Sequence, residues 1–332
     1  MIRKNLSILI LNYNSIDLVQ TFFKENYSDD PTITWCLVDN GSNDIVVDFL
    51  ISYATEKGWN IWNLNEVGPL RGQWLEIHKG KNNSSVQLLL LQENYGYARG
   101  NNFGLDFIDT YIHPDYVMIA NTDIVWGEGV VNHLLEGFSQ DPRLAVIAPR
   151  VVGPDGDEQN PQFLPEKTKI LQSWFRWFYP FSTVFYRLFS KRYDYRRSLE
   201  DFKSSSGLLY LDTEIHCFIG CCFIIDFGVF KNIGFFDSDT FLGTEEPRLV
   251  HRLEEKGFRI AIDLDVSIIH DQGSTTRASF SSRKTMQYFE ESDYTYLRDY
   301  CGYGWFKLLF IKGAARYYEK FWMKIRYLLN IG

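Results

Sequence analysis

The 332-residue chain lacks features that mark several common classes of protein. No uninterrupted apolar run reaches the length of a membrane span, and the first residues hold no long apolar stretch typical of a secretory signal. The formal net charge of −8 disfavours a general nucleic-acid-binding protein. We therefore expect a cytoplasmic protein whose ligand is not a nucleic acid.

Cysteine is scarce, and its spacing does not indicate zinc. The chain has five cysteines, an odd number, and no pair repeats in the manner of a zinc site. We expect all of them to be reduced thiols. They are Cys36, Cys217, Cys221, Cys222 and Cys301.

Apolar residues make up 45% of the chain, enough for a sizeable core. Aromatic residues reach 17%, which suggests contact with sugar, lipid or a protein partner, although large cores also use them.

Strand-like and helix-like segments alternate along the first third of the chain. The predicted strands are residues 6–11, 32–38, 86–91, 116–120, 144–152 and 258–269. The predicted helices are residues 15–24, 44–57 and 245–256, with further helices in the last fifty residues. This order predicts an α/β fold with a mostly parallel central sheet flanked by helices, and a helical C-terminal extension.

Polar groups follow three of the predicted strands: Asp39, the loop of residues 94–102, and Asp123. Each alone is weak evidence, because Asp and Asn are common in turns. In an open α/β sheet, however, the carboxyl ends of the strands meet at one edge, where ligands bind. We therefore expect a ligand site at that edge.

Seven short motifs occur in the order of a known enzyme family and span most of residues 6–275. They are Ile10-Leu-Asn-Tyr-Asn14, Val38-Asp-Asn-Gly-Ser42, Glu93-Asn-Tyr-Gly-Tyr-Ala-Arg-Gly-Asn-Asn-Phe-Gly104, Ile119-Ala-Asn-Thr-Asp123, Gly234-Phe-Phe-Asp237, Phe241-Leu-Gly-Thr-Glu-Glu246 and Ile269-His-Asp-Gln-Gly-Ser274. On these motifs the chain resembles family 2 glycosyltransferases of the GT-A fold, most closely their bacterial rhamnosyltransferase-like group.

The resemblance implies a GT-A domain over residues 1–275. Its nucleotide-binding half would be residues 1–125, and its acceptor half residues 126–275, with an aromatic and basic insertion at 155–213. Residues 276–332 would form a helical, basic C-terminal extension.

The resemblance also implies a donor site. Asp39 would accept the imide N–H of uracil or thymine, for which a carboxylate is a suitable acceptor. The glycines of residues 94–104 would let the backbone approach a nucleotide. The full set of expected donor-binding residues is Asn12, Asn14, Asp39, Asn94, Gly96, Arg99, Asn102 and Asn121.

Asp123 matches the last acid of the family's Asp-x-Asp motif, so the resemblance implies that it binds Mg²⁺ or Mn²⁺ with the donor diphosphate. His270, at a strand end, is the second expected ligand. Asn121 stands where the family has the first acid, so this site carries one negative charge fewer.

Glu246 falls where the family has its catalytic aspartate, and it would take the proton of the acceptor hydroxyl. Glu245 is the second catalytic candidate. Without the family, two acids in a first helical turn would simply match the helix dipole. Arg248 replaces an acid that is common in the family.

Two segments reverse the overall acidity. Residues 165–198 interleave eight Lys or Arg with aromatic residues, and we expect them to contact membrane or a lipid-linked acceptor. Near the C-terminus, cations recur every fourth residue opposite an apolar stripe. That helix would either lie on an anionic membrane or pack on the fold. Its cations are Lys312, Arg316, Lys320 and Lys324, and its apolar residues are Phe310, Ala314, Tyr317, Phe321, Ile325 and Leu328.

The expected function is an inverting hexosyl- or rhamnosyltransferase using a UDP- or dTDP-sugar, with dTDP-rhamnose among the candidates. The acceptor would be a lipid-linked or growing glycan in bacterial cell-surface polysaccharide synthesis, at the inner face of the cell membrane. The sequence leaves open whether the protein forms a homodimer. Two alternatives remain, a nucleotidyltransferase and a catalytically degenerate sugar-nucleotide-binding module.

Overall fold

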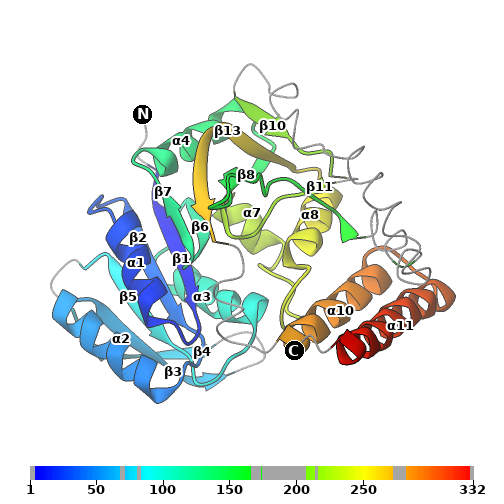
Figure 1. The fold of residues 1–332 in the computed structure, drawn as a ribbon. Helices are drawn as coiled ribbons and strands as arrows, with labels where there is room; N and C mark the ends of the chain where they lie inside the picture. The colour runs from blue at the N-terminus through cyan, green and yellow to red at the C-terminus, as the bar shows by residue number, and fades with distance from the viewer. Residues whose placement is uncertain are drawn as a thin grey trace.

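The computed structural model of the chain describes residues 4–67, 72–80, 84–165, 173, 207–213, 216–271 and 282–329. In these residues eleven strands form one sheet in the order β10-β13-β8-β12-β6-β1-β2-β5-β3-β4, with β7 paired to β13. Helices cover both faces of this sheet (Figure 1). The α/β fold class expected from the sequence is confirmed.

The first part of the chain builds the parallel region of the sheet. Its neighbouring strands β6, β1, β2, β5 and β3 all pair in parallel. Most of their residues are buried because helices cover both faces, which explains the continuous apolar runs. The bounds are β1 Leu6–Asn12, β2 Ile33–Asp39, β3 Asn60–Val67, β5 Val86–Leu90 and β6 Tyr116–Asn121.

The two sides of the sheet add antiparallel pairs. Strand β4 forms a hairpin with β3, and β12 runs antiparallel between β6 and β8. Strand β13 is parallel to β8 but antiparallel to β7 and β10. A separate small sheet joins β9 and β11. The bounds are β4 Gly72–His78, β7 Ile124–Trp126, β8 Leu144–Val152, β9 Gln162–Phe163, β10 Leu208–Tyr210, β11 His216–Cys217, β12 Cys222–Asp226 and β13 Arg259–His270.

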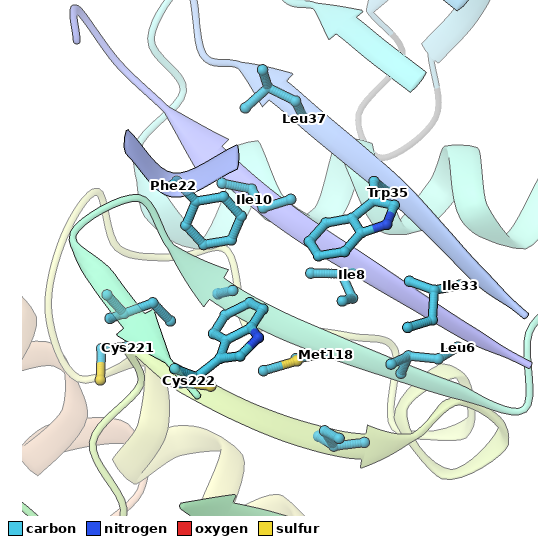
Figure 2. Packing of buried hydrophobic residues seen from close by; sticks show 14 of the residues in the cluster. Leu6, Ile8, Ile10, Phe22, Ile33, Trp35, Leu37, Met118, Cys221 and Cys222 are labelled. Carbon is cyan, nitrogen blue, oxygen red and sulfur yellow. The ribbon is translucent and has the colours of Figure 1, made fainter. Parts of the chain in front are cut away.

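Side chains that alternate along the strands feed two cores, one on each face. Helices α1 (Ile16–Asn26), α2 (Asp44–Lys57) and α4 (Val130–Gly137) pack on one face. Figure 2 shows this core, in which Phe22 of α1 lies near Ile10 and Trp35. Helices α3 (Tyr97–Tyr111), α7 (Phe227–Asn232) and α8 (Glu245–Glu255) pack on the other face.

The chain ends in two antiparallel helices, α10 (Ser282–Asp299) and α11 (Trp305–Leu329). They lie side by side near α8 (Figure 1), with Tyr296 and Leu297 packed against Leu308 and Ile311. Among the described residues, no helix is both long enough and apolar enough to cross a membrane.

Candidate active site

A cavity of about 600 Å³ opens at the carboxyl edge of the parallel strands. The strands end together there, because Asn12 pairs with Asp39 and Leu11 pairs with Asn121. A volume of this size suits a small-molecule ligand. Eight of the residues expected from the sequence line it: Asn12, Asn94, Gly96, Asn121, Asp123, Glu245, Glu246 and His270.

Asp39 and Asn14 do not line the cavity. The buried Asp39 accepts hydrogen bonds from Asn12 Nδ2 at 3.0 Å, Ser42 Oγ at 2.6 Å and Ser42 N at 3.0 Å. Burial raises the pKa of Asp39, and these hydrogen bonds offset only part of the rise. Asn14 Oδ1 accepts from the backbone and the side chain of Asn43, both at 2.9 Å. In this structure Asp39 orients Asn12, which does face the cavity.

Asn102 and Arg99 also lie outside the cavity lining. Asn102 Nδ2 donates to Phe236 O at 2.8 Å, and Phe236 N donates to Asn102 Oδ1 at 3.0 Å. This pair joins α3 to the loop before α8. The guanidinium of Arg99 lies 5.2 Å from the ring centre of Tyr95.

The register of β7 on β13 sets Asp123 beside His270, since Ile124 pairs with His270. Both side chains are buried, and His270 Nε2 lies 3.6 Å from Asp123 Oδ1. Gln159 Nε2 donates to His270 O at 3.1 Å, so Gln159 Oε1 is the atom 2.7 Å from His270 Nδ1. An amide oxygen only accepts, so Nδ1 carries the proton and Nε2 presents its lone pair to Asp123.

This donor set fits a divalent metal. Burial lowers the pKa of His270, although Asp123 and Asp271 oppose the shift, so its imidazole is neutral and able to bind an ion. Asp123 adds a carboxylate oxygen. Two side chains are too few for a complete coordination shell, so an ion here needs oxygen atoms from a bound diphosphate or water.

A second group of metal-ligating side chains lies elsewhere among the described residues. His133, Asp263 and Asp265 bring one ligand atom each within 4.8 Å of one another. His133 lies on α4, and Asp263 and Asp265 lie on β13. None of the three lines the cavity.

Glu245 and Glu246 open α8 at the cavity wall. Glu245 Oε1 accepts from Gly243 N at 2.8 Å. Burial and the neighbouring charge of Glu246 raise the pKa of Glu245 to about 8. Burial also raises the pKa of Glu246, and backbone amides including that of Gly220 oppose the rise. The pair therefore holds a proton more readily than free glutamates, as expected for a group that accepts one in a reaction.

Several lining residues were not predicted from the sequence. Tyr97 donates its hydroxyl to Gly220 O at 3.1 Å within the cavity wall. Thr285, Phe289 and Asp293, spaced four apart on α10, form part of the wall. That spacing on one helical face was the only available signal, because nothing in the sequence connects α10 to the strand ends.

The chain is similar to known glycosyltransferases in sequence and in fold. The family model described as glycosyl transferase family 2 matches residues 73–234. The chain is 25% identical over 190 residues to an N-acetylglucosaminyl-diphospho-decaprenol L-rhamnosyltransferase of Mycobacterium tuberculosis, a match covering 56% of this chain and 55% of the relative. The chain thus spans about half the length of the curated relative it matches.

Two solved structures share the fold. One is a mannosyltransferase from Pyrobaculum calidifontis in complex with GDP-Man and Mn²⁺, with a TM-score of 0.53 and 14% identity over 95% of this chain and 70% of that one. The other is GalNAc-T7 with UDP, GalNAc and Mn²⁺, with a TM-score of 0.52 and 11% identity over 81% of this chain and 44% of that one. These likenesses show that the chain has the GT-A fold, and its residues 73–234 match glycosyl transferase family 2.

Proposed function

We propose that the chain is an inverting, metal-dependent glycosyltransferase that uses a UDP- or dTDP-sugar. The observation that carries this proposal is one cavity lined by Asp123 and His270 on one side and by Glu245 and Glu246 on another. Asp123 and His270 Nε2 would hold Mg²⁺ or Mn²⁺. When bound, the ion would neutralise charge on the departing nucleoside diphosphate.

The chain's own residues would accept the proton and contact the donor and the acceptor. Glu246 accepts the proton of the acceptor hydroxyl as the oxygen attacks the anomeric carbon from the face opposite the leaving diphosphate. Asn12 and Asn94 offer amide groups to the donor. Phe289, Asp293 and the rest of the α10 wall border the acceptor side.

The acceptor proposed is a lipid-linked or growing glycan of a bacterial surface polysaccharide. The rhamnosyltransferase relative is named for a lipid diphosphate acceptor, which supports a lipid-linked acceptor and makes dTDP-rhamnose a donor to test first. We retain the proposed division into a GT-A domain at 1–275 and an extension at 276–332.

Helix α11 supports placement at an anionic membrane surface. Leu308, Ile311 and Ala314 pack inward, whereas Trp305 and Phe306 are 62% and 80% exposed. The cations that follow, Lys312, Arg316 and Lys320, are also exposed. The helix thus packs on α10 with one face and presents aromatic and cationic side chains on another. The segment 165–198 lies almost wholly outside the described residues, as does the side chain of Lys324.

A panel of UDP- and dTDP-sugars, tested with and without Mn²⁺, examines this function. We expect the melting temperature to rise only with nucleotide and metal together, and the purified protein to hydrolyse its donor slowly to a nucleoside diphosphate. Binding without any hydrolysis or transfer would favour the degenerate module. Release of pyrophosphate from a nucleoside triphosphate and a sugar phosphate would favour the nucleotidyltransferase.

A further inference from the structure

Arg248 is fully buried behind the first turn of α8 and joins three parts of the chain. Its Nη1 donates to Asp237 Oδ2 at 2.6 Å, and its Nη2 donates to Thr295 Oγ1 of α10 at 2.7 Å. Its Nε donates to Thr244 Oγ1 at 3.3 Å. The ring of Tyr300 lies 5.1 Å from the guanidinium carbon. The guanidinium fork therefore bridges α8, the loop before it and α10, which a lysine could not do.

Asp237 is held from α10 as well. The hydroxyl of Tyr300, directly after α10, donates to Asp237 Oδ2 at 2.5 Å. Burial alone would raise the pKa of Asp237, but the hydrogen bonds from Tyr300 and Arg248 bring it below its usual range. The carboxylate therefore stays ionised beside the buried arginine, which keeps the ion pair intact.

Helix α10 also holds the loop of residues 241–244, which leads into α8. The rings of Phe241 and Tyr288 stack with their centres 4.3 Å apart. Ser292 Oγ donates to Leu242 O at 2.7 Å. The loop is thus fixed by a stacked ring and a hydrogen bond to α10.

Thr244, the last residue before α8, has a φ of 66°. A β-branched residue rarely occupies this left-handed region, and it persists there only when its surroundings hold it. Thr244 Oγ1 donates to Ser292 O at 3.4 Å and accepts from Arg248. Because Glu245 and Glu246 follow directly, the backbone at Thr244 sets where their carboxylates begin.

We infer that Arg248 is a positioning residue, which together with α10 fixes Thr244 and so places the two carboxylates at the cavity wall. The catalytic consequence rests on the proposed function, whereas the mechanical connection does not. Through Arg248, α10 thus becomes part of the framework that places these two carboxylates.

The test cuts the connection from the α10 side, without touching α8 or the cavity. Thr295→Val with Tyr300→Phe removes one hydrogen bond to Arg248 and one to Asp237. We expect kcat for transfer or donor hydrolysis to fall about ten- to a hundred-fold with the donor KM unchanged, because small misplacements of reacting groups cost about this much. Arg252→Lys is the control, since Arg252 donates to Phe235 O at 2.7 Å from the next turn of the same helix. It should leave kcat near the wild-type value.

Amide hydrogen exchange measures how firmly α10 holds the loop before α8, and it needs no substrate. In the double variant, amides of residues 241–247 should exchange faster, while those of β1 and β2 should not change. Unchanged exchange in 241–247 would overturn the connection, even if the wild-type protein transfers no sugar. Faster exchange with wild-type kcat would overturn the positioning role. An inactive wild-type protein whose double variant still shows the faster exchange would count against the proposed function alone.

Discussion

At the scale of single residues, the chemistry depends on charges that the fold sets. Glu245 and Glu246 are adjacent, and both carboxyl groups sit in the low-dielectric wall of the cavity. Since two neighbouring buried carboxylates cannot both ionise easily, the pair titrates as a unit. A proton acceptor with a raised pKa loses function as the pH falls through that pKa, so transfer should decline at a higher pH than an ordinary glutamate would allow.

The same pair makes stability depend on pH. The pKa of Glu245 is raised to about 8 by burial and by Glu246, so the folded state binds more protons than the unfolded state between the ordinary glutamate range and pH 8. Stability is therefore lost as the pH rises through that window. In thermal melts, Glu245→Gln should gain over wild type as the pH rises from 5 to 8. Glu255→Gln, at the exposed end of α8, is the control. An equal gain at every pH would contradict this account.

Two groups of side chains among the described residues could hold the metal, and one variant in each group tells them apart. Asp123→Asn should abolish the Mn²⁺-dependent rise in melting temperature with nucleotide, because it removes the carboxylate that lies 3.6 Å from His270 Nε2. A ligand at a hundred times its Kd contributes about 2.7 kcal/mol, which is readily measured. His133→Ala should have no effect. The opposite pair of results would move the metal to the group on α4 and β13.

The residue-level site was predictable where it depended on strand ends. Three of the lining residues end strands and a fourth lies in the turn that follows one of them, so their position in the sequence is enough to bring them to one edge. The first three are Asn12, Asn121 and His270, and the fourth is Asp123. Side-chain direction was not predictable, because it depends on contacts from distant segments. Asn102, for example, lies in the right motif but bonds the backbone of Phe236, 134 positions later.

At the scale of elements, the close approach of a loop to the Glu246 side chain shapes the cavity wall. The loop between β11 and β12 passes against the first turn of α8, and a Cβ built on Gly220 would lie 1.7 Å from Glu246 Oε1. Only glycine lets the carboxylate occupy its place there.

Gly220→Ala should therefore displace the Glu246 carboxylate and lower kcat about ten- to a hundred-fold, with little effect on donor binding. Gly127→Ala is the matched control, since a Cβ there meets nothing within 4 Å. Steady-state kinetics on both variants measures the difference. Wild-type turnover in Gly220→Ala would show that this contact does not matter for transfer.

Elements with local signals were predicted well. Helix α2 was predicted over its observed bounds. In the structure Asn43 caps its start by accepting from Val46 N, and Gly58 ends it with a φ of 73°. The β3–β4 hairpin was not predicted. Strand β3 buries Ile61 and Leu64 in the cores on opposite faces of the sheet, and its irregular register on β4 breaks the alternation that would reveal a strand.

At the scale of the whole molecule, the C-terminal helices face two ways. Helix α10 lines part of the cavity, and α11 exposes aromatic side chains to solvent. The sequence left open whether α11 packs on the fold or lies on a membrane. The structure shows the packing on α10, and the exposed face remains available for the proposed membrane contact.

We expect the protein to sediment with anionic vesicles at low salt and to be released at high salt, since each cation contributes about 1 kcal/mol that salt screens. Trp305→Ser with Phe306→Ser should weaken sedimentation. Ile45→Ser, which removes an apolar side chain 78% exposed on α2, should not. Wild-type protein that stays in the supernatant at every salt concentration would contradict the proposed membrane contact.

The role of Glu246 as proton acceptor is tested most directly by comparing Glu246→Gln with wild type for donor binding and for turnover. The amide keeps the shape of the side chain but cannot accept a proton. We expect an unchanged donor Kd with turnover lower by about a hundred- to ten-thousand-fold. Wild-type turnover in Glu246→Gln, with turnover lost instead in Glu245→Gln, would contradict this role.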